Sequence, residues 1–148
     1  MQYVYSDLMR NGVLWVSVLA WAIAQIIKIL IEFVETKKLN LALIVSSGSM
    51  PSSHSSFTTS LATSIGIVEG FDSSLFAIAV IFSMVVMYDA AGVRRAAGKQ
   101  AEVINLLVGS IENTGIKLDK KLKELLGHSP IEVAAGALLG IVVAIIFA

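Results

Sequence analysis

The sequence predicts an all-α integral membrane protein, and three observations support this prediction. Of the 148 residues, 56% are hydrophobic and only 15% are charged, whereas soluble domains carry about a quarter charged residues. The mean hydropathy is +0.82. Several apolar runs are long enough to cross a hydrocarbon layer of roughly 30 Å as helices. We expect a single membrane domain, residues 1–148, with about four transmembrane helices.

The first predicted transmembrane helix covers residues 12–34. About 22 residues, at 1.5 Å each, reach across the hydrocarbon. This segment includes Lys28, an ionisable residue at membrane depth. The apolar stretch 39–45 follows and is too short to span, so we expect a re-entrant or interfacial segment there.

Two further helices are predicted over residues 51–68 and 75–93. The first begins with many Ser and Thr residues, whose hydroxyls can bond to their own helix or to a neighbouring helix. Asp72 or Ser73 is expected to cap the second. We expect this helix to end at the polar run that contains Asp89, Arg94 and Arg95.

The connection 94–130 is polar and is expected to lie outside the hydrocarbon. Leucines recur at helical spacing between residues 117 and 126, which predicts an amphipathic surface helix there. A second helix is predicted around 97–113, with a turn near 113–115 between the two.

The fourth transmembrane helix is predicted over residues 131–148. The run Ser129-Pro130-Ile131-Glu132 is a strong helix start, with Ser as the cap, Pro first and Glu as the capping-box partner. Gly136 and Gly140 form a GxxxG pair, which permits close helix packing and suggests a homodimer.

Charge asymmetry predicts the orientation. With four spans, the 35–54 and 94–130 connections lie on the same side of the membrane, and nine of the eleven basic residues fall in them. The positive-inside rule then places both connections in the cytoplasm. We therefore expect a multi-pass protein of a cell membrane, in a prokaryote the inner membrane, with its polar groups at the cytoplasmic face.

The stretch 48–56 has the composition of an anion site. If Pro51 opens a helix, the N–H groups of Ser52, Ser53 and His54 lack intrahelical partners. Free N–H groups at the positive end of a helix dipole bind phosphate, and His54 could exchange a proton with the bound group. The alternative is a flexible Ser-rich loop.

Other ionisable groups are predicted to converge on the same face. Lys28 either binds phosphate as a point charge or extends its ammonium to the interface. Arg94 and Arg95 are adjacent and cannot share one helical face, so one would bind phosphate and we favour Arg95. Asp89 either orients an Arg or a His, or simply ends the helix.

His128 is the candidate nucleophile because it just precedes a helix start. A phosphoryl acceptor needs a neutral ring nitrogen and a carboxylate that fixes the tautomer. Glu132 could be that carboxylate, or it could only close the capping box with Ser129. Zinc explains the two histidines less well, because His54, His128 and a distant acid lack tight ligand spacing.

Three motifs resemble a known family: Gly-Ser-Met-Pro-Ser-Ser-His-Ser, Tyr-Asp-Ala-Ala-Gly-Val-Arg-Arg-Ala-Ala-Gly-Lys-Gln-Ala and Leu-Gly-His-Ser-Pro-Ile-Glu-Val. They are similar to the divergent branch of the phosphatidic acid phosphatase type 2 superfamily, which is called acid phosphatase/vanadium-dependent haloperoxidase-related. The resemblance extends from residue 24 to residue 140.

The resemblance implies roles for individual residues. His128 would be the nucleophile, with Glu132 in the place of the motif's Asp, and His54 would protonate the leaving group. Lys28, an Arg and the N–H groups after Pro51 would hold the phosphate. This chain departs from the superfamily pattern in four ways: the first motif lacks Arg-Pro, Ser53 replaces a glycine, Glu132 replaces an aspartate, and residues 96–127 separate the Arg from the His.

The functional expectation is a metal-independent and cofactor-independent phosphatase. It would hydrolyse the phosphomonoester or diphosphate of a membrane lipid through a phosphohistidine, and no nucleic-acid partner is expected. The alternatives are a non-catalytic protein that binds or transports an anionic lipid phosphate, and a small scaffold subunit, which would leave the paired histidines unexplained. A vanadium haloperoxidase is disfavoured because the relatives with that chemistry are soluble and much larger.

Overall fold

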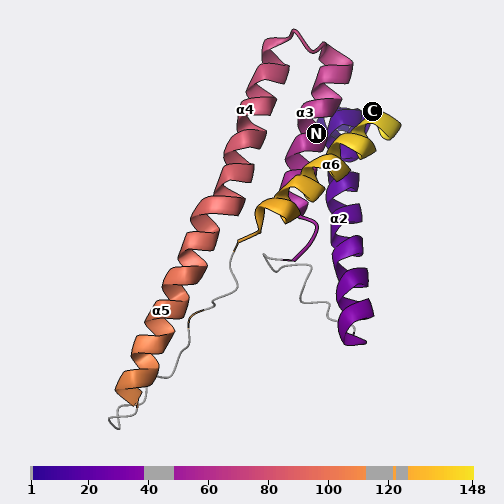
Figure 1. Ribbon diagram of the computed structural model, residues 1–148. Helices are drawn as coiled ribbons and strands as arrows, with labels where there is room; N and C mark the ends of the chain where they lie inside the picture. Colours follow the sequence, from indigo (N-terminus) through magenta and orange to yellow (C-terminus); the bar gives the residue numbers. More distant parts are fainter. Residues whose placement is uncertain (1, 39–48, 113–121, 123–126) are drawn as a thin grey trace.

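The computed structural model describes residues 2–38, 49–112, 122 and 127–148, and every regular element in this part of the chain is a helix. Figure 1 shows their arrangement. In chain order the helices are α1 (Gln2–Arg10), α2 (Gly12–Thr36), α3 (Ser53–Glu69), α4 (Ser74–Tyr88), the π-helix η2 (Asp89–Val93), α5 (Arg94–Glu112) and α6 (Pro130–Phe147). The predicted all-α class is confirmed. The predicted re-entrant segment at 39–45, the turn near 113–115 and nearly all of the predicted amphipathic helix at 117–126 lie outside the described residues.

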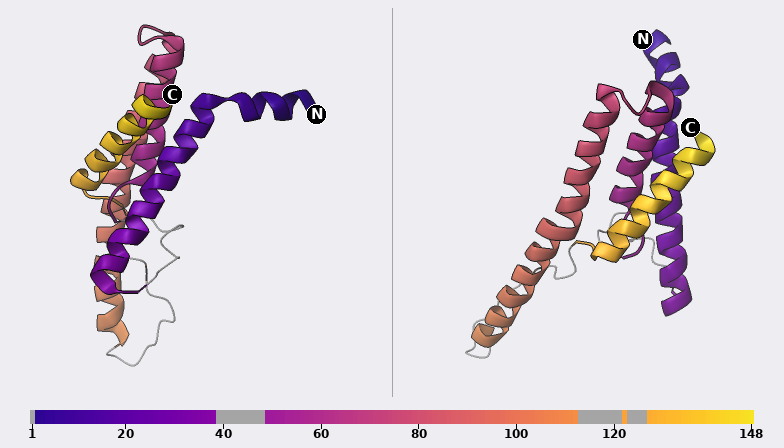
Figure 2. Two further views of the ribbon diagram at one scale, coloured as in Figure 1. Left: turned by 90° about the vertical axis from the view of Figure 1, so that its right-hand side faces the viewer. Right: turned by 45° about the horizontal axis from the view of Figure 1, so that its top comes forward.

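Three helical stretches within the described residues are long and apolar enough to cross a membrane. They are Gly12–Thr36, Ser74–Gly109 and Pro130–Phe147. The predicted second span is a helix over nearly the predicted residues, but α3 has only 17 residues. It runs alongside α2 and α4 in Figure 1, and it packs against α2, α4 and α6. Helix α1 was not predicted and turns away from α2 (Figure 2).

Helix α3 is held in the bundle by buried hydroxyl groups. Serines recur at every fourth position, and all four are fully buried: Ser52, Ser56, Ser60 and Ser64. The Ser56 hydroxyl donates to the carbonyl of Ala20 in α2 at 3.0 Å. Thr59 Oγ1 donates to the Ala137 carbonyl in α6, also at 3.0 Å. Such interhelical hydrogen bonds stabilise helix pairs where water is absent.

The two glycines of the GxxxG pair pack against α3 of the same chain. A Cβ on Gly136 would collide with the Ser52 carbonyl oxygen, and one on Gly140 with the Ser56 carbonyl oxygen. The motif therefore brings α6 onto α3, and the observation that suggested a homodimer has an explanation within one chain.

The helix predicted to end at residue 93 continues instead. Helix α4 widens into η2 and then continues as α5, because the run from Asp89 onward contains no proline and Gly92 alone does not stop a helix. The helix predicted around 97–113 is thus present, but as an extension of α4. The α4–α5 rod leans away from α2 and α6 in both Figure 1 and the right-hand view of Figure 2.

The start of α3 also differs from the prediction. Ser52, not Pro51, is the boundary residue: its hydroxyl caps the helix by accepting from the Ser55 N–H at 3.3 Å. Pro51 lies before the cap, after a cis peptide bond. At the next turn, Ser73 is the residue that caps α4, by accepting from the Phe76 N–H at 3.2 Å.

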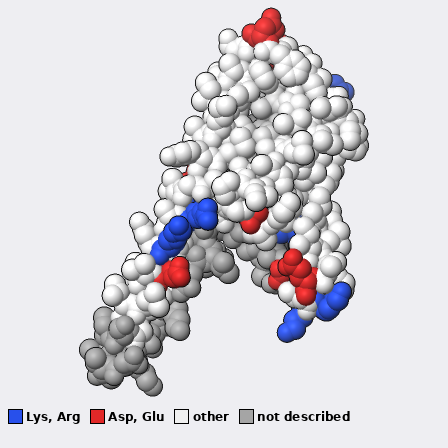
Figure 3. All heavy atoms as spheres, in the orientation of Figure 1, with Lys and Arg blue, Asp and Glu red and all other residues white. Residues whose placement is uncertain are grey.

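The polar ends of several helices gather at one end of the bundle. The last turn of α2, the first turns of α3 and α6, and η2 all lie toward that end, whereas the two termini lie toward the other (Figure 1). Figure 3 shows a wide, nearly uncharged band on one face, with most of the Lys and Arg side chains below it. The two predicted connections therefore leave the same end of the bundle.

Candidate functional site

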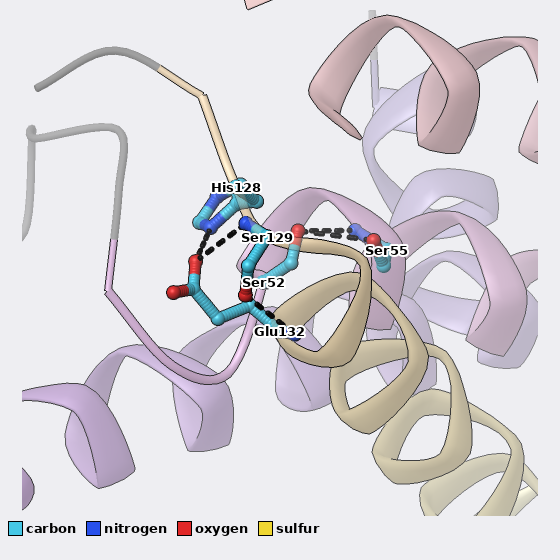
Figure 4. Close-up of polar contacts among 5 residues, drawn as sticks. All are labelled: Ser52, Ser55, His128, Ser129 and Glu132. Atoms are coloured by element: carbon cyan, nitrogen blue, oxygen red, sulfur yellow. Dashed lines mark hydrogen bonds and ion pairs between the residues drawn. The ribbon is translucent and has the colours of Figure 1, made fainter. Parts of the chain in front are cut away.

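The candidate site is built around His128, which lies just before α6. Its side chain is 1% exposed, and Nδ1 lies 2.9 Å from Oε2 of Glu132 (Figure 4). The same oxygen accepts from the Ser129 N–H at 3.3 Å, while the Ser129 hydroxyl accepts from the Glu132 N–H at 3.3 Å. Glu132 therefore closes the capping box and contacts the His128 ring at the same time, so the geometry is compatible with both interpretations left open by the sequence.

Two backbone hydrogen bonds join the segments that carry the site. The His128 N–H donates to the Ala90 carbonyl in η2 at 2.9 Å, and the Ser52 N–H donates to the Glu132 carbonyl at 3.0 Å. A π-helix of this kind is common at functional sites. The long connection that separates the arginines from His128 in sequence is thus bridged in space.

Gly127 allows this close approach and was missed by the sequence reasoning. Its φ is +88°, and a Cβ there would lie 2.5 Å from the backbone nitrogen of Arg95. A side chain would therefore be strained by the dihedral and would also push His128 away from η2. In the sequence, the position of Gly127 directly before the candidate nucleophile His128 was the signal that could have identified it.

The second histidine lies beside the first. The ring centroids of His54 and His128 are 6.4 Å apart, and the planes meet at 61°. His54 is exposed, whereas His128 is buried. Among the described residues, Nε2 of His128 has no hydrogen-bond partner, which is unusual for a buried polar atom.

Lys28 projects from α2 into this environment and is 1% exposed. Burial lowers the pKa of His128 from its ordinary value, and the positive charges of Lys28 and Arg94 act in the same direction. The hydrogen bond and negative charge of Glu132 oppose this shift in pKa. Both cations are therefore close enough to act electrostatically on the imidazole, and its neutral form is favoured.

The two arginines have different surroundings. Arg94 Nε donates to Oδ2 of Asp89 at 2.8 Å, and both side chains are partly exposed. Arg94 and Arg95 are both exposed, but it is the charge of Arg94 that acts on His128. Within the part of the chain that the structure describes, Arg94 is the one of the two arginines with an ion-pair partner, which is Asp89.

Ser52 and Ser53 also differ in their hydrogen bonding. The N–H of Ser52 donates to the Glu132 carbonyl and its hydroxyl accepts from Ser55, so both groups are engaged within the fold. Ser53 and His54 occupy the first positions of α3, where backbone N–H groups have no partner inside the helix. The first turn of α3 therefore offers two donors beside the imidazoles.

Comparison with known proteins gives one family and one relative. The sequence pattern of the "Divergent PAP2 family" matches residues 9–143. A protein of Bacillus subtilis (strain 168), called uncharacterized membrane protein YuiD, is 44% identical over 153 aligned residues, which cover 96% of this chain and 97% of that protein. No solved structure matches the chain.

Proposed function

Since this chain belongs to the divergent PAP2 family, we propose that it is a membrane phosphatase that acts on a lipid phosphate. The reaction is hydrolysis of a lipid phosphomonoester, or of the terminal phosphate of a lipid diphosphate, through a phosphohistidine. The observation that carries the proposal is the state of His128, whose Nδ1 is held by Glu132 while the buried Nε2 has no partner among the described residues.

In the first step His128 is the nucleophile. With the Nδ1 proton donated to Glu132, Nε2 carries a free lone pair. Nε2 attacks phosphorus, the bond from phosphorus to the lipid oxygen breaks, and His54 supplies the proton that the leaving alcohol needs. The ring centroids lie 6.4 Å apart, so the two imidazoles are close enough to act on the same phosphoryl group.

In the second step water breaks the phosphohistidine. His54, now neutral, accepts a proton from the water, whose oxygen attacks phosphorus as the bond to Nε2 breaks. The products are inorganic phosphate and the lipid alcohol, or the lipid monophosphate where the substrate is a diphosphate, and both histidines return to their starting protonation states. The exposed position of His54 suits this exchange, because water must reach it.

The phosphate oxygens are held by positive groups from three helices. Lys28 supplies a buried ammonium from α2, Arg94 a guanidinium oriented by Asp89, and the N–H groups of Ser53 and His54 complete the cradle. Donors arranged in advance around the equatorial oxygens stabilise the charge that develops in the transition state. We assign Arg95 and Ser52 to positions outside this shell.

The orientation of the protein in the membrane follows from the number of crossings and from the position of the basic side chains. We infer four crossings, with α3 as the short one, and a site at the cytoplasmic face of a cell membrane. The gathering of basic side chains below the uncharged band in Figure 3 supports this assignment. A lipid phosphate would then meet the site at the level of its own headgroup.

The test is phosphate release by the purified protein in lipid nanodiscs that contain a diacylglycerol phosphate. His128→Ala should abolish release, and Lys38→Ala, which removes an exposed cation outside the site, should not change it. A radiolabelled substrate phosphate should remain on the protein after alkaline denaturation and leave it in acid.

Equal release by parent and His128→Ala would contradict the phosphohistidine. Tight binding of the intact lipid phosphate without any turnover would instead support the alternative of a non-catalytic protein that binds an anionic lipid.

A further inference from the structure

A groove between α3, α4 and α6 has no part in the proposed chemistry. Its volume is about 420 Å³, which is within the range of small-molecule sites. It is lined mainly by aliphatic, aromatic and methionine side chains, and no charged residue lines it among the residues that the structure describes. Its character is that of a site for hydrocarbon.

The hydroxyl groups of Thr59 and Ser83 along the groove need no hydrogen bonds from an occupant. Ser83 donates to Thr58 Oγ1 at 3.1 Å, and the single Thr59 hydroxyl proton is shared between the carbonyls of Ser55, at 2.7 Å, and Ala137, at 3.0 Å. Because these polar groups are satisfied within the protein, an apolar occupant would leave none of them unpaired. A polar ligand would find few partners.

The groove begins close to the candidate site and runs away from it. Met87, at its inner end, is three residues before Ala90, whose carbonyl holds the His128 N–H. From Thr59 to Ile67 the groove follows α3 for roughly 12 Å. At the far end Phe71 and Phe76 pack edge to face, with centroids 5.1 Å apart.

We propose that this groove binds one hydrocarbon chain of the membrane lipid whose phosphate occupies the site at His128. The inference depends on the proposed site for a lipid phosphate, but not on turnover. An amphiphile with its phosphate at the polar end of the bundle has its chain pointing toward the opposite end, which is the direction of the groove. The apolar lining then shields that chain as the surrounding lipid would.

The first experiment measures occupancy. The protein is incubated with a diacylglycerol phosphate that carries a diazirine midway along one chain, irradiated, and analysed by mass spectrometry of its peptides. Adducts should concentrate at groove residues such as Met84 and Ile141. Unlabelled diacylglycerol phosphate should displace them, whereas diacylglycerol and phosphatidylcholine, which lack a phosphomonoester, should not. Equal displacement by all three lipids would mean ordinary boundary lipid and would overturn the proposal.

The second experiment fills the groove. Met84→Trp adds bulk to the lining, and Val85→Trp is its matched control, because Met84 and Val85 are similarly exposed, at 60% and 62%, and only Met84 lines the groove. Met84→Trp should lower labelling of the groove about tenfold, the effect of losing contact with about two methylene groups. Val85→Trp should leave it unchanged, and equal effects of the two variants would count against the groove.

These measurements separate the two proposals. Phosphate-dependent labelling in a protein that releases no phosphate would keep the groove and refute the phosphatase. Phosphate release without preferential labelling of the groove would keep the phosphatase and refute the groove. A normal elution profile of Met84→Trp in size-exclusion chromatography would show that a loss of labelling does not arise from misfolding.

Discussion

The α2–α3–α6 bundle and the α4–α5 rod are two differently built parts of one molecule. In the bundle, small residues let backbones approach closely, as at Gly136, and hydroxyls connect the helices. The rod is a long helix that leans away, and a Cβ on Gly92 or Gly109 would meet nothing within 4 Å. Helix α4 itself packs on α3, so the open space lies beside η2 and the end of α5, and it is there that the structure tolerates change.

The candidate site lies where these parts meet. Lys28, His54 and Glu132 belong to the bundle, whereas Asp89 and Arg94 belong to the rod. The His128 segment is bonded to both, through the Glu132 carboxylate and through the Ala90 carbonyl. The comparison teaches that the His128 segment is hydrogen-bonded to both parts, whereas the ion pair of Arg94 with Asp89 lies within the rod.

The largest expected effect tests the contribution of the rod. Arg94→Ala should lower the rate of phosphate release by about 10²–10³, the usual result of losing one donor to transition-state charge. Arg95→Ala removes a neighbouring charge of the same kind and should change the rate little. Initial rates at saturating lipid phosphate measure both, and a larger loss in Arg95→Ala would reverse the assignment.

The next effect tests how the bundle holds the nucleophile. Glu132→Gln keeps an oxygen that can accept from the Ser129 N–H, but it removes the charge that orients His128. We expect release to fall by about 10–100-fold, as when the partner of a functional histidine is lost, with unchanged thermal stability. Glu132→Ala should lose the same activity and also about 1 kcal/mol of stability, because the cap is lost as well. Full activity in Glu132→Gln would leave only the capping role.

A third substitution compares packing in the two parts directly. Gly136→Ala places a methyl group against the Ser52 carbonyl and should destabilise the fold by about 2 kcal/mol through overpacking. Gly109→Ala meets open space and should stabilise α5 by up to about 1 kcal/mol. Thermal unfolding in detergent, followed by size-exclusion chromatography, measures both, and equal shifts would mean that the bundle is looser than described.

The smallest expected effect is a change in the pKa of His128, which lies where the bundle and the rod meet. Burial and the charges of Lys28 and Arg94 lower the pKa of His128, and Glu132 raises it. Histidine NMR should therefore give a midpoint below 6.5. Arg94→Ala should move the pKa upward and Glu132→Gln downward, because they remove opposite charges. The chain has two histidines, so a His54→Gln variant assigns the signals, and shifts of the same sign would contradict this electrostatic picture.

The sequence predicted well what local patterns control. The capping box at Ser129, the apolar run of α2 and the polar start of α3 follow from composition and spacing, and all three are present. The placement of the two polar connections on one side followed from the predicted number of spans. These features depend on neighbours within a few residues or on hydropathy, which a single sequence contains.

What the sequence could not supply depends on contacts between distant segments. The bond from the His128 N–H to Ala90 needs a π-helix, and no residue type marks one. Gly136 was interpreted as a dimer contact because GxxxG does not say which helix packs on it. The choice between Arg94 and Arg95 turned on the side chain of Asp89, whose direction is set by the helix continuing past residue 93.

The serines spaced four apart along α3 have a consequence for biogenesis. Helix α3 is not one of the three stretches that are long and apolar enough to span a membrane by themselves. Its transfer from the translocon into the lipid, without partner helices, is therefore only weakly favourable in free energy. The carbonyl groups that accept from its hydroxyls lie on α2, which is already synthesised, and on α6, which is synthesised last. We therefore expect stable insertion of α3 to depend on the C-terminal helix, and a chain that ends before α6 would lack both the Thr59–Ala137 hydrogen bond and a settled topology.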